Sequence, residues 1–276
     1  MISLFLPLLL GACAQEPSPA VLLRAYSHND YLQARPLLDA LDRGFFGVEA
    51  DVHLKDGELL IGHEAGDLKA GVTLKKLYLD PLLARARATG GKIHPGGPKG
   101  FLLMVEFKSD GDASYRVLRE QLKDYEEMLT VFTDDAFEER AITILISGKR
   151  PERLLLEEPA RPAALDGNFG DFDRTEKTLF PVISDYWWKI LGPKGTLDRI
   201  ALARLKHFAQ RAHDRGRQIR FYGAPNAEWS WRLLYEAGID RINADDLEGL
   251  RKFLLSREPR PIDRAENAVG LIAAPL

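Results

Sequence analysis

The chain has 276 residues, with 38 basic and 41 acidic side chains and a formal net charge of −3 at pH 7. This balance gives no support to nucleic-acid binding, which requires a basic surface. The length suits a single α/β barrel better than two small domains, and the sole cysteine, Cys13, excludes an intrachain disulfide.

The N-terminal residues are predicted to direct export. The mostly apolar run over residues 2–10 is shorter than the ~20 apolar residues of a membrane-spanning helix, and small residues follow it. We expect a signal peptide over 1–14 and a tether over 15–20, hence an exported protein of the periplasm or cell envelope, with secretion as the alternative. The segment before Cys13 also resembles a bacterial lipobox, in which residues 1–12 are removed and Cys13 carries a lipid anchor. A buried N-terminal strand is the other interpretation of the apolar run.

The folded domain is expected over residues 21–255. Its first predicted elements are a strand over 21–29, an amphipathic helix over 31–43 that ends before Gly44, and a second strand over 45–54. Together they form a strand-helix-strand unit, which is the repeating unit of a parallel sheet.

Four side chains in this unit carry the chemistry. His28 stands at the end of the first strand, where residues of a parallel barrel face the site. Glu49 and Asp51 lie two apart on the second strand and share a face, where like charges repel unless a cation or protons intervene. A short strand over 58–62 then returns the chain and brings His63 near the pair.

The rest of the domain alternates apolar strands with amphipathic helices, which is typical of a (β/α)8 TIM barrel. Six further strands are expected over residues 101–107, 141–147, 163–166, 181–184, 219–223 and 240–243. The helices between and after them are expected over residues 72–89, 114–127, 196–215, 227–237 and 247–255. The remaining segment, 256–276, is a C-terminal tail to which we assign no role.

The third strand adds two charged residues at the same end of the barrel. Residues 101–105 form a continuous apolar run typical of a buried parallel strand, and Glu106 and Lys108 follow it on one face. Glu49, Asp51 and Glu106 on neighbouring strand ends could therefore hold one hard divalent cation through oxygen ligands. Lys108 would offer positive charge to a substrate phosphate.

These motifs carry a family resemblance. The ordered set His28-Asn29-Asp30, Glu49-x-Asp51, His63-Glu64 and Glu106-x-Lys108 resembles the glycerophosphodiester phosphodiesterases and the wider superfamily of phospholipase C-like phosphodiesterases. The stretches HNDY, LLDAL, VEADV and TLKKLYLDPLL are similar to a subgroup called altered inheritance of mitochondria protein 6. Residues 236–246 resemble the last strand of the family. The resemblance implies the same (β/α)8 barrel.

The resemblance also implies roles for the matching residues. His28 and His63 would form an acid-base pair, and Glu49, Asp51 and Glu106 would bind one Ca²⁺ or Mg²⁺ ion. Physical chemistry gives the same allocation, because imidazole exchanges a proton near neutral pH whereas carboxylates must be ionised to bind a metal. The attacking group is left open: it is either water or a hydroxyl of the substrate, which would first form a cyclic phosphate.

Four further residues bear on substrate binding or on the surface. The wider family has an arginine after its first histidine, whereas Asn29 here offers a phosphate only neutral hydrogen bonds. Trp187 is expected in an apolar wall of the cleft, with core packing as the alternative. Asn243 is expected to contact substrate, with helix capping as the alternative. His94, in a Gly/Pro-rich loop, is expected on the surface.

The sequence therefore predicts an exported, metal-dependent phosphoric diester hydrolase acting on a glycerophosphodiester or phospholipid-like substrate. A catalytically silent barrel that binds a phospholipid headgroup or polyol phosphate is the alternative from another class of protein. A phospholipase D-like enzyme is the other enzymatic alternative. We predict no nucleic-acid or protein partner, and membrane contact only through the N-terminal lipid anchor.

Overall fold

The computed structural model describes residues 19–191 and 199–257. The expected signal peptide with Cys13, the tether as far as residue 18 and the tail from residue 258 lie outside these ranges. Within the described ranges, no helix combines the length and the apolar character needed to cross a membrane.

Eight parallel strands form a nearly closed barrel. Around the barrel they follow the order β1, β2, β4, β7, β8, β9, β10, β11, and β11 pairs with β1 again. A single parallel bridge between Arg220 and Arg241 joins β10 to the residue that precedes β11. The predicted (β/α)8 barrel is thus confirmed. The barrel strands are β1 (Ala25–Ser27), β2 (Gly47–Lys55), β4 (Phe101–Phe107), β7 (Ile142–Gly148), β8 (Ala163–Gly167), β9 (Val182–Tyr186), β10 (Gln218–Tyr222) and β11 (Ile242–Ala244).

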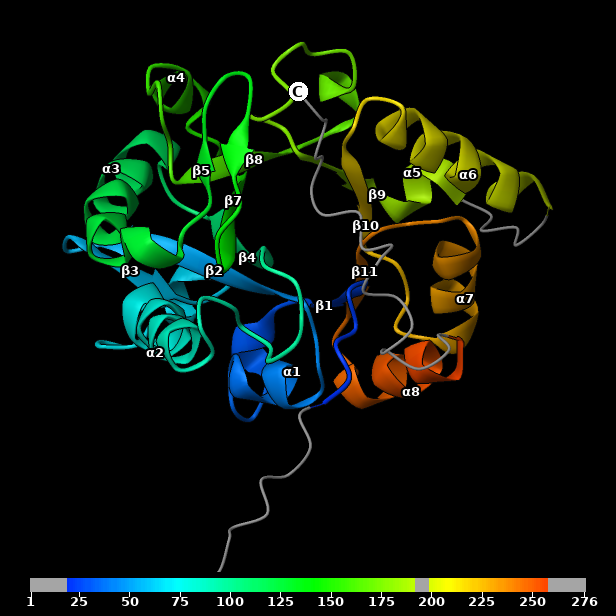
Figure 1. The fold of residues 1–276 in the computed structure, drawn as a ribbon, viewed down its shortest axis with the longest axis horizontal. Helices are drawn as coiled ribbons and strands as arrows, with labels where there is room; N and C mark the ends of the chain where they lie inside the picture. Colours follow the sequence, from blue (N-terminus) through cyan, green and yellow to red (C-terminus); the bar gives the residue numbers. More distant parts are fainter. Residues whose placement is uncertain (1–18, 192–198, 258–276) are drawn as a thin grey trace, which may run out of the picture.

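The helices lie outside the strands and surround them (Figure 1). They are α1 (Leu38–Asp42), α2 (Asp80–Ala88), α3 (Gly111–Leu122), α4 (Glu152–Leu156), α5 (Trp187–Leu191), α6 (Arg199–His213), α7 (Glu228–Glu236) and α8 (Leu247–Arg257). Shorter helical segments are the 3-10 helices Asp30–Leu32, Ala65–Asp67, Lys123–Met128 and Phe169–Asp171 and the π-helix Lys75–Leu79. The sequence patterns did not predict α4 and α5, each of which has only five residues.

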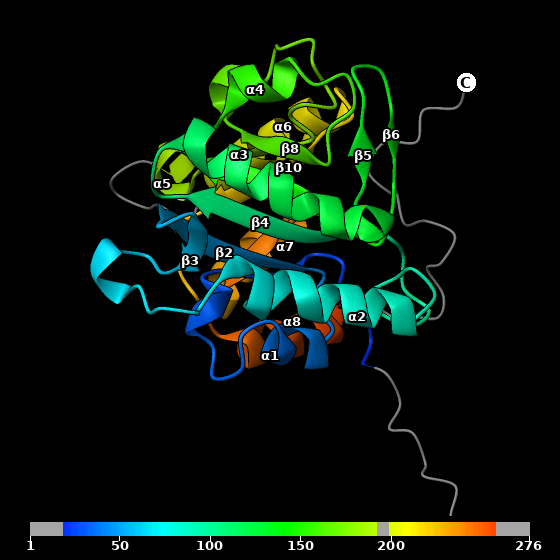
Figure 2. The same ribbon diagram turned by 90° about the vertical axis from the view of Figure 1, so that its left-hand side faces the viewer.

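Two antiparallel additions extend opposite ends of the barrel (Figure 2). Strand β3 (Glu58–Ile61) pairs with the last residues of β2, as the sequence predicts. The hairpin of β5 (Val131–Phe132) and β6 (Phe137–Glu138) was not predicted, because its strands have only two residues each. Strand β3 therefore extends the end where the barrel strands finish, and the hairpin lies near their start.

Two groups of buried apolar side chains account for the layered architecture. The larger group fills the space between the barrel and the helices; Val48, Ala50 and Val52 of β2 belong to it. The smaller group lies inside the barrel and consists of Tyr26, Leu102, Met104, Phe132, Leu145, Ala164 and Val182. Because successive strand residues point to opposite faces, Glu49 and Asp51 of β2 point inward, with the smaller group.

The predicted continuous helix over 31–43 is wrong. It is replaced by the 3-10 helix Asp30–Leu32 and by α1. Pro36 disfavours helical geometry at the preceding residue, and Leu37 adopts a positive φ of 63°. The buried carboxylate of Asp30 fixes this bend, because Oδ2 accepts a 2.5 Å hydrogen bond from the backbone N–H of Leu37 and one of 3.0 Å from the hydroxyl of Tyr78.

Candidate active site

A cavity of about 460 Å³ opens where the barrel strands end. Six residues singled out from the sequence line it, namely His28, Asn29, Glu49, His63, Glu106 and Lys108. They come from β2, β4 and the loops after β1, β3 and β4. The parallel arrangement brings them together, because the ends of neighbouring parallel strands meet at one end of a barrel.

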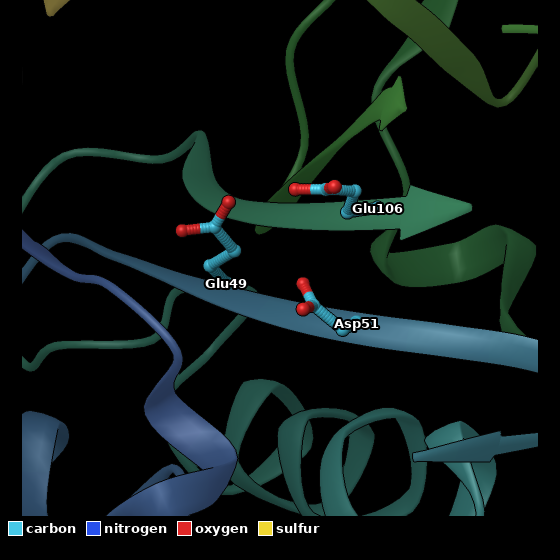
Figure 3. A group of neighbouring side chains, drawn as sticks. All are labelled: Glu49, Asp51 and Glu106. Atoms are coloured by element: carbon cyan, nitrogen blue, oxygen red, sulfur yellow. The ribbon is translucent and has the colours of Figure 1, made fainter. Parts of the chain in front are cut away.

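Three carboxylates converge beside this cavity. Asp51 and Glu106 are register partners on β2 and β4, and Glu49 lies one inward position before Asp51. Each of the three offers an oxygen within 4.8 Å of the others. Figure 3 shows the carboxyl groups of Glu49 and Asp51 from β2 gathered near that of Glu106 from β4. Glu49 and Asp51 are buried, so their charges are poorly solvated by water.

Two cationic side chains lie against the carboxylates. Lys108 Nζ is 3.0 Å from Asp51 Oδ2 and 2.6 Å from Glu106 Oε1. Arg220 Nη2 lies 3.4 Å from both carboxylate oxygens of Glu49. Burial, followed by the charges of Glu106 and Glu49, raises the pKa of Asp51 to about 6, while Lys108 lowers it. The two cations therefore offset only part of the mutual repulsion.

The donor set fits a hard divalent cation. Asp51 Oδ1 is buried and has no hydrogen-bond partner within the described ranges, so a lone pair is left for a metal. Asp166 adds a fourth carboxylate 3.5 Å from Arg220. When ionised, the four carboxylates exceed the two cations by two negative charges. Burial raises the pKa of Asp51 to about 6 and that of Asp166 to about 7, so a bound Ca²⁺ or Mg²⁺ would favour their ionised forms. Both ions prefer carboxylate oxygens.

His28 is oriented by a carboxylate outside the cluster. Its Nδ1 lies 2.8 Å from Asp245 Oδ1, and its Nε2 lies 3.9 Å from Glu49 Oε2. Burial lowers the pKa of His28, but the hydrogen bond with Asp245 and the charge of Glu49 outweigh it, so the pKa is raised above 6.5. Asn226 in turn donates a 2.7 Å hydrogen bond to Asp245 Oδ2.

His63 reaches the same cavity from the loop after β3. Its Nδ1 is 2.9 Å from Glu64 Oε1, and the side chain is about half exposed, at 52%. His53 on β2 supports this loop, because its Nε2 lies 3.1 Å from the backbone carbonyl oxygen of His63. The structure thus brings both predicted histidines to one cavity, with His28 more deeply held than His63.

Asn29 also lines the cavity, and it is linked to the carboxylates through Tyr31. The Tyr31 hydroxyl lies 2.9 Å from Asp51 Oδ2 and 3.1 Å from Asn29 Oδ1. Asn29 adopts the left-handed conformation, with φ of 45°, which asparagine tolerates better than most residues. The sequence patterns did not single out Tyr31, because it was assigned to the helix that the structure lacks.

The expected position of Trp187 is wrong. Its side chain is fully buried between the barrel and its helices, packs near Trp229 with ring centroids 6.3 Å apart, and is not among the residues that line the cavity. The cause is α5, which begins at Trp187 directly after β9 and turns the indole away from the opening.

Asn243 is buried and also does not line the cavity. Its Oδ1 accepts a 3.0 Å hydrogen bond from Arg220 Nε, so Asn243 helps to hold that arginine side chain in place inside the barrel. The expected substrate contact of Asn243 is therefore wrong, and the residue supports Arg220 instead. It pairs with Tyr26 inside the barrel, before the end of β11 where the cavity opens.

Sequence reasoning did not single out two charged groups at the site, namely Arg220 and Asp166. Arg220 stands between the apolar Ile219 and Phe221 of β10. A single charged residue inside an apolar strand could have indicated that its side chain points into the site. The same holds for Asp166 in β8. Asp245, at the end of the last strand, was expected like Asn243 to contact substrate or to cap the following helix, whereas the structure places it against His28.

The chain is similar in sequence and in fold to known proteins. Residues 18–163 match the family model of the AIM6-like phosphodiesterase domain. The chain is 29% identical over 271 residues to altered inheritance of mitochondria protein 6 of Eremothecium gossypii, an alignment covering 84% of this chain and 70% of that protein. It is 23% identical over 261 residues to a homologue from Arthroderma benhamiae, covering 83% and 82% respectively. A solved structure from Silicibacter pomeroyi, assigned as a glycerophosphoryl diester phosphodiesterase, shares the fold with a TM-score of 0.54 and 14% identity, covering 86% of this chain and 94% of that one.

Proposed function

Because the chain belongs to the family of AIM6-like phosphodiesterase domains, we propose that it is a metal-dependent phosphoric diester hydrolase. The observation that carries the proposal is the convergence of Glu49, Asp51 and Glu106 within 4.8 Å beside a cavity that His28 and His63 also line. A binding protein would need the carboxylates and a cation, but it would have no use for two imidazoles at the same opening.

The three carboxylates would hold one Ca²⁺ or Mg²⁺ ion, with the free Oδ1 of Asp51 as one ligand atom. When bound, the ion would polarise a non-bridging phosphate oxygen and offset the charge that develops in the transition state. Lys108 lies against Asp51 and Glu106, and its positive charge would neutralise part of the negative charge of these two carboxylates.

His28 is suited to act as the general base. A hydrogen bond from Nδ1–H to Asp245 leaves the lone pair of Nε2 free, on the side facing Glu49. This nitrogen would accept the proton of the attacking water or substrate hydroxyl. His63 would protonate the departing alkoxide, so one proton is taken up and one is released in each cleavage.

Phosphate binding relies on Lys108 and Arg220, since Asn29 carries no charge. Both cations line the cavity and lie against ligand carboxylates, Lys108 at Asp51 and Glu106 and Arg220 at Glu49. The cavity volume of about 460 Å³ is in the range of small-molecule sites, which favours a small diester or a lipid headgroup as the substrate.

Turnover of bis(p-nitrophenyl) phosphate tests this proposal. We expect hydrolysis that depends on added Ca²⁺ or Mg²⁺ and stops with EDTA. The His28→Ala and His63→Ala variants should each lose roughly 10²- to 10⁴-fold in kcat. His207→Ala is the matched control, because that histidine is exposed on α6. Turnover that survives EDTA or His28→Ala contradicts the proposal, and tight binding of a diester without turnover would favour the silent binder.

A further inference from the structure

Tyr31 is a residue of the site to which the proposed function gives no role. It lies in the 3-10 helix Asp30–Leu32, directly after His28 and Asn29. Its ring is half-buried and packs against the apolar layer between the barrel and the helices, while its hydroxyl lies 2.9 Å from Asp51 Oδ2. A neutral side chain therefore contacts one of the three carboxylates that would bind the ion.

The segment that carries Tyr31 is fixed by its neighbour Asp30. The buried carboxylate of Asp30 accepts a 2.8 Å hydrogen bond from the hydroxyl of Ser27, in addition to those from Leu37 and Tyr78. These three bonds join the segment to β1, to the residue before α1 and to the π-helix. The hydroxyl of Tyr31 is thus held at a defined place beside the barrel.

The two carboxylate oxygens of Asp51 have different surroundings. Oδ2 contacts the hydroxyl of Tyr31 and, at 3.0 Å, Nζ of Lys108. Oδ1 is buried and has no hydrogen-bond partner within the described ranges. Because the last torsion of an aspartate side chain is only weakly restricted, the carboxyl group turns unless its partners hold it. The contacts of Oδ2 therefore decide where Oδ1 points, and Oδ1 is the atom left for the ion.

The hydroxyl of Tyr31 has a single hydrogen, and two acceptors lie near it. An ionised carboxylate attracts this hydrogen more strongly than a neutral amide oxygen does, so the donated bond goes to Asp51. The amide of Asn29, with Oδ1 3.1 Å from the same hydroxyl, can turn and donate from its NH₂ group instead. Both contacts are then satisfied, and Tyr31 links the loop after β1 to Asp51.

Tyr31 and Lys108 contact the same oxygen of Asp51 but differ in charge. Lys108 is a cation, which also lies 2.6 Å from Glu106 Oε1, and a bound divalent ion would repel it. The hydroxyl of a tyrosine is neutral at neutral pH, so the ion would not repel it in this way. Tyr31 can therefore keep its contact with Oδ2 when the ion is bound.

We propose that Tyr31 is a positioning residue of the metal site, whose hydroxyl holds Oδ2 of Asp51 so that Oδ1 is presented to the Ca²⁺ or Mg²⁺ ion. The proposal rests on the proposed function, since it concerns a ligand of the ion that the hydrolase would use. It gives Tyr31 no part in proton transfer, so the hydroxyl should affect the affinity for the ion and leave the chemistry that follows intact.

Calorimetric titration with Ca²⁺ and with Mg²⁺ tests this role without turnover. Tyr31→Phe removes the hydroxyl and keeps the ring, so the fold should be retained. We expect the Kd for the ion to rise by roughly 10- to 100-fold, the usual effect of removing a hydrogen bond to a metal ligand. Tyr115→Phe is the matched control, because the Tyr115 hydroxyl donates a 2.8 Å hydrogen bond to Glu158 and neither residue lines the cavity. Its Kd should be unchanged.

Melting temperatures in EDTA separate the proposed role from a general contribution to stability. Tyr31→Phe and Tyr115→Phe should each lose at most about 2–4 °C, the size expected for one hydrogen bond in a domain of this length. A lower melting temperature of Tyr31→Phe with an unchanged Kd would show that the residue is merely structural and would overturn the proposal.

Hydrolysis of bis(p-nitrophenyl) phosphate at increasing metal concentration gives a second readout. Tyr31→Phe should need roughly 10- to 100-fold more metal for half-maximal turnover, whereas its kcat at saturating metal should approach that of the unsubstituted protein. A kcat that saturating metal does not restore, together with an unchanged Kd, would overturn the positioning role. If the unsubstituted protein binds the ion but hydrolyses no diester, the hydrolase proposal fails, and the Kd of Tyr31→Phe still decides the role of Tyr31. If it binds neither ion, both proposals fail.

Discussion

The Nδ1 atom of His28 lies 2.8 Å from Oδ1 of Asp245, although the two residues are 217 positions apart in the chain. The closure of the barrel makes this contact possible. Ser27 on β1 and Ala244 on β11 are register partners, so the residues that follow them emerge side by side. The backbone N–H of Asp245 donates a 2.7 Å hydrogen bond to Asn226, which fixes the carboxylate against the loop after β10. The orientation of His28 therefore depends on the last strand of the fold.

Replacing Asp245 tests whether this contact serves catalysis. In Asp245→Asn, the hydrogen bond no longer favours the protonated imidazole, so the pKa of His28 falls. We expect the limb of the pH profile of kcat/KM that reports His28 to move to lower pH, and kcat to fall by roughly 10²-fold. Asp214→Asn, which alters an exposed aspartate after α6, is the control. An unchanged profile in Asp245→Asn would show that the contact is only structural.

Replacing Asp51 should affect the stability of the protein differently with and without a bound metal ion. Burial and two neighbouring carboxylates raise the pKa of Asp51, so its ionised form is unfavourable in the metal-free protein. Asp51→Asn should therefore leave the melting temperature in EDTA unchanged or higher. In the unsubstituted protein, Ca²⁺ or Mg²⁺ at 100 times its Kd should add about 2.7 kcal/mol to the free energy of unfolding. That increment should vanish in Asp51→Asn, and an equal increment in both proteins would place the ion elsewhere.

Much of this fold follows from local sequence patterns. Strand β4 has the bounds expected from an uninterrupted apolar run, and the two-residue period of a strand is what placed Glu49 and Asp51 on one face. Glu106 could be placed beside Glu49 and Asp51 once the two strands were predicted to be parallel neighbours. The parallel pairing of β2 with β4 confirms that prediction.

The features that could not be predicted depend on contacts between distant segments. Arg220 reaches Glu49, 171 positions away, only because their strands face each other across the barrel interior. His94 was expected on the surface because its loop is rich in glycine and proline. That prediction is wrong, since His94 is buried near Phe46 and Phe101, with ring centroids 6.4 and 6.3 Å away. Composition alone does not tell which side of a loop packs against the barrel.

Gly148 at the end of β7 should be sensitive to a single added methyl group. Its φ is +70°, and a Cβ would lie 2.5 Å from the carbonyl oxygen of Phe107 and 2.9 Å from Cγ of Glu106. Gly148→Ala should cost about 1–3 kcal/mol from backbone strain, and more from the clash, and should weaken metal binding by displacing Glu106. Denaturant unfolding and metal titration measure the two effects.

Gly96 provides the matched comparison for this substitution. It has a similar φ of +72°, but a Cβ there would meet nothing within 4 Å. Gly96→Ala should therefore show only the strain cost, with unchanged metal affinity. Equal losses of stability in the two variants, with metal affinity intact in both, would mean that Glu106 tolerates the methyl group.

His94 should make the protein less stable in mild acid. Burial lowers its pKa, and Arg85 lowers it further, whereas the 2.8 Å hydrogen bond from Nε2 to the carbonyl oxygen of Phe45 raises it. The folded pKa thus lies below the unfolded value of about 6.5, so the unfolded chain binds the proton more readily. The contribution of neutral His94 to stability is complete above that value. It is lost as the pH falls through 6.5 towards the folded pKa, at up to about 1.4 kcal/mol per pH unit.

His94→Gln isolates this contribution, because glutamine can still donate to the carbonyl of Phe45 but does not titrate. We would measure the free energy of unfolding by denaturant at several pH values between 5 and 8 for both proteins. The difference between the unsubstituted protein and His94→Gln should shift in favour of the variant as the pH falls, whereas His207→Gln on α6 should follow the unsubstituted protein at every pH. Parallel curves for the unsubstituted protein and His94→Gln would show that the buried ring accepts its proton without penalty.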